Sequence, residues 1–494
     1  MVVSYNKSIN LNLLQRIFVE MAEKVRFFNT MARKVQDFES INPDKVGLYT
    51  CGPTVYNFAH IGNFRAYTFE DILCRTLRLA GYEVRQIMNL TDVDDKTIRD
   101  SQKENLPLKE FTARYIKAFF EDLAKLRIHP AAVYPPATEH IPEMIALIQK
   151  LFDKGYAYCA EDKSVYFAID KFPAYGKLAN IDRENQRAGV RIKTDEYAKD
   201  SVADFALWKA WDEKDGDVVW DSPWGKGRPG WHIECSAMAM KYLGPTFDIH
   251  TGGIDNMFPH HEDEIAQSEG ANEVKYVNYW LHCAHLMVNG EKMSKSLGNF
   301  FTLRDLENQG RSGREIRYVL MGTHYRKKLN FTFDALDQAK EALRKFDDCF
   351  VRLAAAAGDG SADAEARTAA GKAVEAFKNA MFDDLNTAEA SAAIYNLFHD
   401  ANKLLADNRL SADGGKAILD AFRTFDQVWA CLDVDAALAA DNSIPAEIEA
   451  MAAARVEARK NKNWAESDRL RDEIKAAGYA VEDIPGGGYR VKKL

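Results

Sequence analysis

Two short polar segments that lie far apart in the chain carry side chains suited to phosphate chemistry. The first is His60-Ile61-Gly62-Asn63 and the second is Lys292-Met293-Ser294-Lys295-Ser296. A histidine, a glycine and an asparagine at the start of a helix can bind phosphate through side-chain donors and backbone amides. Mobile lysines bind a phosphate more strongly as negative charge develops on it. Together the two segments predict activation of an α-phosphate with pyrophosphate as the leaving group.

Each segment also has a simpler explanation when it is taken alone. Asn63 could cap a helix, and His60 could be a buried histidine whose hydrogen bonds are satisfied. Lys292 and Lys295 could be solvated loop lysines. The presence of both segments together with a strand-loop-helix unit favours the catalytic interpretation.

A second group, made of two cysteines, a histidine and a glutamate, could bind a metal ion. Cys51 ends the first predicted strand and Cys235 lies near the start of a helix. His260 and Glu264 are four residues apart and therefore share one face of another helix. Two thiolates, an imidazole and a carboxylate suit Zn2+ and can admit a further substrate ligand. Each residue alone could be an ordinary core or helix-start residue, so the prediction depends on all four meeting at one site.

Two other metal interpretations are weaker. His261-Glu262 resembles the start of a zinc-protease H-E-x-x-H motif, but Ile265 occupies the position of its second histidine. Asp92, Asp94 and Asp95 could bind Mg2+, although N-capping of the next helix explains them at least as well. We assign no function to this acidic run.

The elements that must position these residues begin with an α/β pattern. Residues 46–51 predict a buried strand, an amphipathic helix ending near Gly81 follows, and residues 84–88 predict a second strand. This βαβ unit implies α/β architecture with a Rossmann-type parallel sheet, in which ligands bind at the carboxyl ends of the strands. Asn289-Gly290 predicts a two-residue hairpin turn just before the lysine segment.

The α/β pattern resumes after an insertion. A helix is expected over residues 231–243, closed by Gly244, and a strand over residues 247–250. A turn at Gly252-Gly253 and a helix from about His260 follow.

Beyond Thr332 the pattern becomes helical. Apolar residues alternate spacings of three and four over residues 336–353, as in the seam of a bundle. Helices led by Thr387 and Lys416 complete a predicted bundle of about four helices. A small mixed α/β module with two charged helices is expected from Ile444 onwards.

The composition is that of a globular protein with several domains. The chain has 494 residues, a net charge of −9 and 47% hydrophobic residues. Its acidic balance argues against a wholly basic nucleic-acid-binding protein. Seven cysteines without a CxxC pair predict free thiols in a reducing compartment. No signal-like or membrane-spanning stretch is evident, so a cytoplasmic location without membrane partners is expected.

The two phosphate-binding segments resemble the signature motifs of class I aminoacyl-tRNA synthetases, and further stretches resemble the cysteinyl-tRNA synthetase family. These stretches are YTCGPTVY (49–56), NLTDVDDK (89–96), GWHIECSAM (230–238), FPHHEDEIAQS (258–268) and EKMSKSLGN (291–299). The similarity extends from about Val25 to the C-terminus. Asn63 departs from the signature, which most often has a second histidine there, and it cannot supply an imidazolium.

The resemblance implies roles for individual residues. One Zn2+ per chain would be held by Cys51, Cys235, His260 and Glu264, and it would take the thiolate of substrate cysteine. Trp231 would form a wall of the cysteine pocket, and Asp255 would hold the adenosine ribose. ATP, with Mg2+, would bind at His60, Asn63, Asp255 and Lys295. The catalytic residues would be His60, Asn63, Lys292 and Lys295.

The reaction that the resemblance implies is a two-step ligation. L-cysteine would be activated by ATP to cysteinyl-adenylate and then transferred to the 3′ end of tRNA(Cys), by an enzyme expected to be a monomer. A related ligase that joins cysteine to an amino sugar is one alternative, and a noncatalytic RNA-binding protein derived from a synthetase is another. The long bundle and tail after Thr332 favour tRNA as the acceptor, and the intact motifs favour catalysis.

The predicted domain organisation follows from these patterns. Residues 1–24 form an N-terminal extension, and residues 25–135 and 230–275 form the Rossmann-type catalytic domain. Residues 136–229 form an inserted connective domain, and residues 276–331 form a stem-contact region that bears the lysine segment. Residues 332–440 form a helical-bundle anticodon-binding domain, and residues 441–494 form the mixed α/β module, whose basic residues are expected to contribute to anticodon binding.

Overall fold

The computed structural model describes residues 22–181, 204–294, 296–440, 444–484 and 488–493. The chain forms two compact units, Met1–Asp433 and Val434–Leu494. Most of the predicted N-terminal extension, residues 182–203 of the predicted insertion, and Lys295 lie outside the described residues. Within the described ranges, every helix is too short or too polar to span a membrane.

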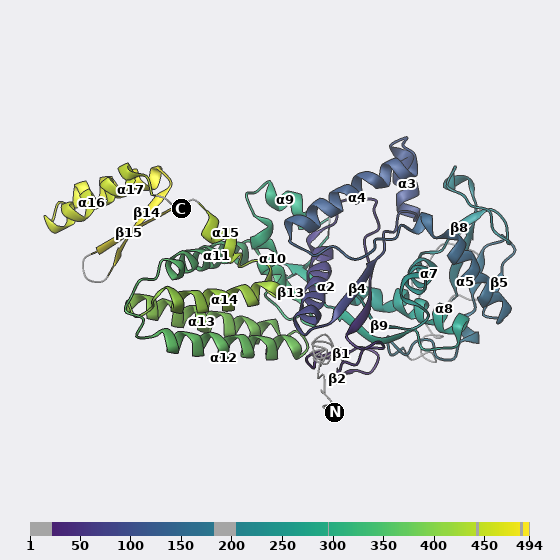
Figure 1. The fold of residues 1–494 in the computed structure, drawn as a ribbon. Coiled ribbons are helices and arrows are strands. Elements are labelled where there is room, and N and C mark those ends of the chain that lie inside the picture. The colour runs from purple at the N-terminus through teal and green to yellow at the C-terminus, as the bar shows by residue number, and fades with distance from the viewer. Residues whose placement is uncertain (1–21, 182–203, 295, 441–443, 485–487, 494) are drawn as a thin grey trace, which may run out of the picture. The chain divides into compact units, whose positions relative to one another are not determined.

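The first unit is built around a sheet of four parallel strands in the order β10-β9-β3-β4. The strands are β3 (Lys45–Thr50), β4 (Glu83–Met88), β9 (Phe247–Gly253) and β10 (Val277–Cys283). Between β3 and β4 runs α2 (Ile61–Leu79), which packs against β4 and β9 (Figure 1). This arrangement confirms the predicted Rossmann-type sheet and places Cys51 at the carboxyl end of β3.

The sequence of α2 explains both its packing and its end. The predicted apolar stripe is buried against the sheet, at Phe69, Ile72, Leu73, Thr76, Leu77 and Ala80. The chain then leaves the helix through Gly81, whose φ of 101° lies in a region that other residues rarely adopt. A short hairpin of β1 (Arg26–Asn29) and β2 (Lys34–Asp37) precedes β3 in the sequence. Strand β1 packs beside β10.

The predicted turn at Gly252-Gly253 is wrong, because both glycines continue β9 and pair with the end of β10. A Cβ added at Gly252 would lie 2.8 Å from Cε1 of the buried His261 ring. Glycine is therefore needed at position 252 for the close approach of His261 to the strand, which the sequence pattern cannot distinguish from a turn.

Two helices complete the second half of the parallel sheet. The first, α7 (Trp231–Leu243), has the predicted bounds and ends at Gly244. The second, α8 (Glu262–Asn272), begins two residues after the expected His260, because the short turns η4 (Ile254–Asn256) and η5 (Met257–His261) precede it. Helix α7 packs against both α8 and β3.

The segment between β4 and α7, which includes the predicted insertion of residues 136–229, adds helices and a second sheet. Its helices are α3 (Asp95–Lys103), α4 (Leu108–Lys125) and α5 (Ile141–Asp153), with short turns η1 (Ala137–Glu139), η2 (Ile169–Lys171) and η3 (Glu213–Asp215). Its antiparallel sheet is β5 (Ala157–Cys159), β6 (Val165–Phe167), β7 (Phe205–Ala210) and β8 (Gly227–Pro229). One apolar core joins Tyr49 and Ile87 of the parallel sheet to Phe167 and Trp208 of the antiparallel sheet. The insertion is therefore packed directly against the parallel sheet.

The Asn289-Gly290 hairpin is confirmed. It joins β11 (Leu286–Val288) to β12 (Glu291–Lys292), and both turn residues have the positive φ that a type I′ turn requires. Strand β13 (Leu329–Phe331) pairs with β11, and helices α9 (Leu303–Glu307) and α10 (Gly313–Met321) lie between β12 and β13 in the sequence.

The predicted bundle is also confirmed. It consists of α11 (Phe333–Ala354), α12 (Asp363–Phe382), α13 (Thr387–Ala406) and α14 (Ala412–Trp429), which lie side by side in Figure 1. The predicted seam of α11 is buried, at Leu336, Ala339, Leu343, Phe346, Phe350 and Leu353.

A buried ion pair ties α2 to the end of this bundle. Arg317 of α10 lies 2.6 Å from Asp71 of α2, and both side chains are fully buried. The Arg317 guanidinium also donates to the carbonyls of Trp429 at 2.7 Å and Leu126 at 3.0 Å, which end α14 and follow α4. A guanidinium capping the last carbonyls of a helix is favoured by the helix dipole.

We expect Asp71→Ala to lower the free energy of unfolding by about 3–5 kcal/mol, because it leaves the buried charge of Arg317 without its partner. Lys416→Ala is the control, since it removes an exposed ion pair with Asp420 of the same 2.6 Å length, and exposed pairs contribute about 0–1 kcal/mol. Urea unfolding followed by circular dichroism measures both. Equal losses of unfolding free energy in the two variants would show that the buried pair contributes no more to stability than an exposed pair.

The second unit is small and mixed α/β. It contains α15 (Val434–Ala439), α16 (Ala446–Lys460) and α17 (Trp464–Ala476), followed by the antiparallel strands β14 (Tyr479–Ile484) and β15 (Gly488–Lys493). Ile448, Ala452 and Ile474 form its own buried core. The mixed α/β character predicted for the end of the chain is confirmed, while the compact unit begins at Val434 and not at Ile444.

Candidate active site and metal centre

The His60 segment forms the N-terminal cap of α2. Nδ1 of His60 accepts a hydrogen bond from the Asn63 amide at 3.1 Å, and Oδ1 of Asn63 accepts one from the His60 amide at 3.1 Å. This reciprocal capping box is the helix-cap role that the sequence left open for Asn63. It also selects a tautomer: because Nδ1 accepts, the neutral ring carries its proton on Nε2, which can donate to a ligand.

The lysine segment reaches the His60 segment. The Ile61 amide donates to the carbonyl of Phe301 at 3.0 Å. A Cβ added at Gly62 would lie 3.0 Å from Cε of Met293, so only glycine allows this approach without displacement of a neighbour. The structure therefore brings together the two segments that the sequence singled out for phosphate chemistry.

The loop that carries the lysines is fixed by one asparagine. Oδ1 of Asn299 accepts from the Ser294 amide at 2.8 Å, and Nδ2 of Asn299 donates to the carbonyl of Lys292 at 3.3 Å. The Lys292 side chain is exposed at the end of β12. Lys295 lies outside the described residues, so its role stays a prediction.

The four residues predicted to bind metal lie together. They are Cys51, Cys235, His260 and Glu264, and their ligand atoms all lie within 4.8 Å of one another. Cys51 follows β3, Cys235 lies in the first half of α7, and the other two flank the start of α8. Nε2 of His260 is 3.1 Å from Oε1 of Glu264.

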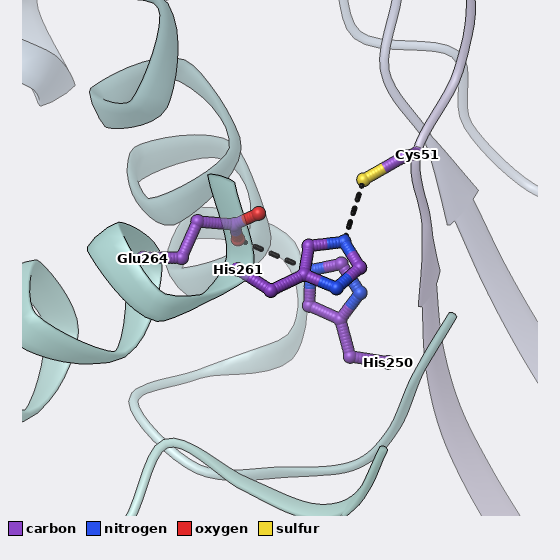
Figure 2. Close-up of side chains that lie close together, drawn as sticks. All are labelled: Cys51, His250, His261 and Glu264. Carbon is purple, nitrogen blue, oxygen red and sulfur yellow. Dashed lines mark hydrogen bonds and ion pairs between the residues drawn. The ribbon is translucent and has the colours of Figure 1, made fainter. Parts of the chain in front are cut away.

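Two further histidines form an overlapping set with Cys51 and Glu264, shown in Figure 2. Nε2 of His261 lies 3.2 Å from Sγ of Cys51, and Nε2 of His250 lies 3.1 Å from Oε2 of Glu264. The Tyr276 hydroxyl donates to the same Oε2 at 3.2 Å. Oε1 of Glu264 is buried, and no described residue hydrogen-bonds to it. This oxygen, which faces His260, is thus the one suited to a cation.

A chain of polar contacts orients His260. Nε2 of His232 is 3.3 Å from Oδ2 of Asp263, and Nδ1 of His232 is 2.8 Å from Nδ1 of His260. A carboxylate only accepts, so a neutral His232 that faces Asp263 carries its proton on Nε2, and His260 then donates from Nδ1 to Nδ1 of His232. Nε2 of His260 is then unprotonated and lies 3.1 Å from Oε1 of Glu264. Two acceptors 3.1 Å apart repel unless a cation lies between them, so the arrangement fits a metal ion.

The protonation chemistry of the cluster also fits a metal. Burial lowers the pKa of His260 to about 3, which keeps the imidazole in its neutral, ligating form. The hydrogen bond with Cys51, burial and Glu264 raise the pKa of Cys235 well above its ordinary value. The same hydrogen bond lowers the pKa of Cys51, but burial and Glu264 outweigh it, so that pKa is raised. A bound cation would deprotonate both thiols, and two sulfurs, one nitrogen and one oxygen suit Zn2+.

Trp231 lies beside this cluster, and Asp255 follows one of the strands that lead to it. The Trp231 ring, at the first position of α7, stacks on the ring of His260 with centroids 4.4 Å apart, yet the residue is 41% exposed. Such a ring can bound a pocket for a small substrate next to the metal ligands. Asp255 is exposed in η4, directly after β9, at the same edge of the sheet as Cys51.

The acidic run after β4 has structural partners. Asp92 accepts from the amide and the hydroxyl of Thr138 at 2.9 and 2.6 Å. Asp94 is the N-cap of α3, which is the role weighed for this run from the sequence. Asp95 pairs with Lys209 at 2.9 Å. These contacts explain the three carboxylates without a cation.

The sequence analysis missed the residues that orient the ligands. They are His232, His250, His261, His282 and Asp263. Three of them lie inside the stretches 230–238 and 258–268, so the density of polar side chains there was an available signal. The other two lie in β9 and β10, where alternation indicates burial but says nothing of hydrogen bonding.

Comparisons with known proteins agree with this geometry. Residues 37–341 match the family model for the tRNA synthetases class I (C) catalytic domain. Residues 376–429 match a DALR domain, and residues 441–489 match the cysteinyl-tRNA ligase anticodon binding domain.

Two curated relatives are similar over nearly their whole length. The cysteine--tRNA ligase of Chlamydia caviae is 48% identical over 477 residues, which cover 96% of this chain and 99% of the relative. That of Chlamydia pneumoniae is 49% identical over 475 residues, with coverage of 96% and 99%.

Among solved structures, the methionyl-tRNA synthetase of Mycobacterium tuberculosis in complex with methionyl-adenylate has a TM-score of 0.62. It is 14% identical, and the match covers 81% of this chain and 94% of that one, which shows the shared class I fold. With the catalytic-domain match and the near full-length relatives, the chain belongs to the cysteine--tRNA ligase family of class I aminoacyl-tRNA synthetases.

Proposed function

We propose that the chain activates L-cysteine with ATP and transfers the cysteinyl group to the 3′ end of tRNA(Cys). The observation that carries the proposal is that the two segments predicted to bind phosphate and the candidate metal cluster of two thiols, a histidine and a glutamate lie near the carboxyl edge of one parallel sheet. In the first step a carboxylate oxygen of cysteine attacks the α-phosphorus, and the bond to pyrophosphate breaks. In the second, a hydroxyl of the terminal ribose attacks the carbonyl carbon and AMP leaves.

The chain's own residues supply positioning and charge in the first step. His60 donates from Nε2 to a phosphate oxygen, while Lys292 and Lys295 stabilise the charge that develops as pyrophosphate departs. Asn63 acts through its capping box, which holds the His60 ring and the amides at the start of α2 toward the phosphates. Asp255 binds the ribose of ATP, which enters with Mg2+.

The substrate side chain is recognised at the metal cluster. One Zn2+ would be held by Cys51, Cys235, His260 and Glu264, and when bound it supplies a soft Lewis acid for the thiolate of cysteine. Trp231, stacked on His260, bounds the pocket and excludes larger side chains. No side-chain nucleophile is required by this scheme.

The second unit supports tRNA as the acceptor. It contains the residues that match the anticodon binding domain, a part that a ligase for a small amino-sugar acceptor does not need. Trp464 is 59% exposed at the first position of α17 and offers an aromatic face to an unstacked base. Arg455, in contrast, is buried and paired with Asp483, so its role is structural.

Cysteine-dependent exchange between ATP and pyrophosphate tests the proposal. We expect exchange with cysteine, little with serine, and a strong fall after zinc is removed by a chelator, because activation requires the thiolate to be held. Restoring Zn2+ should restore exchange. Exchange that needs no cysteine, or that serine supports equally, would refute the proposed activity.

A further inference from the structure

The loop formed by residues 172–181 of the insertion, here called the Tyr175 loop, reaches the metal cluster. The Tyr175 hydroxyl donates to Oδ1 of Asp263 at 2.5 Å. The other carboxylate oxygen of Asp263 is the one that faces His232, whose ring contacts His260. A continuous chain of polar contacts therefore runs from Tyr175 through Asp263 and His232 to a predicted metal ligand.

The loop itself is held firmly on the same helix start. Glu262, the residue next to Asp263, accepts from the Gly176 amide at 2.7 Å and the Ala179 amide at 3.0 Å. Leu178 is fully buried in the core shared by the two sheets. Glu262 and Asp263, in the first turn of α8, thus hold the loop. The two predicted ligands on either side of them, His260 and Glu264, face the candidate metal position.

Phe205 packs against the rings of both Tyr175 and His232. Phe205 of β7 stacks on Tyr175 with centroids 6.5 Å apart and meets the His232 ring edge-on at 5.8 Å. Asp263 is 1% exposed, so its contacts with Tyr175 and His232 are made away from solvent, where their geometry matters most.

We propose that Tyr175 is a positioning residue for the metal centre: by fixing the Asp263 carboxylate, it fixes the ring orientation and tautomer of His232 and hence of His260. The proposal rests on the proposed function, since it assumes that His260 binds the metal. It assigns to the inserted segment a part in building the cysteine site. Loss of an outer hydrogen-bond partner of a ligating histidine weakens metal binding by about 10–100-fold.

The test is the zinc affinity of the full-length protein, measured by competition with a chromogenic chelator, for Tyr175→Phe. We expect affinity to fall by about 10-fold, the lower end of that range, because Tyr175 lies beyond Asp263 in the chain. The KM for cysteine in pyrophosphate exchange should rise, while the KM for ATP should not change. Tyr158→Phe is the matched control, since it also removes a hydroxyl that donates to an aspartate of the insertion, Asp204, at 2.9 Å. It should leave zinc affinity unchanged.

A double variant separates positioning from general damage to the fold. Asp263→Asn should itself weaken zinc binding, and adding Tyr175→Phe to it should have little further effect, because the chain is already broken. If Tyr175→Phe binds zinc as tightly as Tyr158→Phe does, the positioning role is refuted while the metal site stands. If His260→Ala binds zinc as tightly as the unmodified protein, the proposed metal site itself fails.

Discussion

Replacing Cys235 with serine is expected to remove the metal and with it most of the discrimination between cysteine and serine. The two amino acids differ only by sulfur for oxygen, and an apolar pocket separates such small groups by no more than about 10–200-fold. Discrimination of about 10⁴ corresponds to roughly 5.5 kcal/mol and needs a ligand contact that only a thiolate makes. In Cys235→Ser the ratio of activation rates should fall to about 200 or below.

The reason is the chemistry of the cation rather than the size of the pocket. Coordination deprotonates a thiol readily, whereas a hydroxyl is a hard and weakly acidic ligand. Metal content by emission spectrometry, together with pyrophosphate exchange for both amino acids, measures the effect. Cys349→Ser is the control, because Cys349 is fully buried in α11 and outside the cluster. A metal-free Cys235→Ser protein that still rejects serine would overturn this account.

The grouping of the four predicted ligands could be anticipated because each lies at the end or start of an element of the parallel sheet. Cys51 follows β3, Cys235 lies in the first half of α7 and His260 precedes α8, and such positions converge at one edge of the sheet. Two of the ligands also share a helix face by simple spacing. Topology and periodicity were therefore enough to bring them together.

The residues that orient the ligands follow no period. Asp263 contacts Tyr175 of the insertion and His232 of α7. The spacing of residues in the sequence predicts neither contact. The Gly252-Gly253 error has the same origin, because a close approach by His261 decides the residue type there. Contacts between elements distant in sequence determine these features, and a single sequence carries no direct signal of them.

Ending the chain after Asp433 is expected to abolish efficient charging of tRNA and to leave adenylate formation nearly unchanged. The second unit has its own core and its own sheet, so we expect the first unit to keep its fold without it. The last residues of the first unit make hydrogen bonds within that unit. The Asp433 amide donates to Asp426 at 3.0 Å, and Arg314 donates to the Leu432 carbonyl at 2.6 Å. We expect kcat/KM for tRNA to fall at least about 100-fold, or about 2.7 kcal/mol.

The position of the cut decides whether this experiment is informative. A cut before Thr332, which the change of sequence pattern suggests, would remove α14 and with it the Trp429 carbonyl that binds the buried Arg317. That protein would lose adenylate formation through unfolding, and the result would say nothing of tRNA. With the cut after Asp433, cysteine-dependent exchange within about two-fold of the full chain serves as the internal control, because a two-fold change is less than about 0.5 kcal/mol. A shortened protein that charges tRNA at the full kcat/KM would show that the second unit takes no part in tRNA recognition.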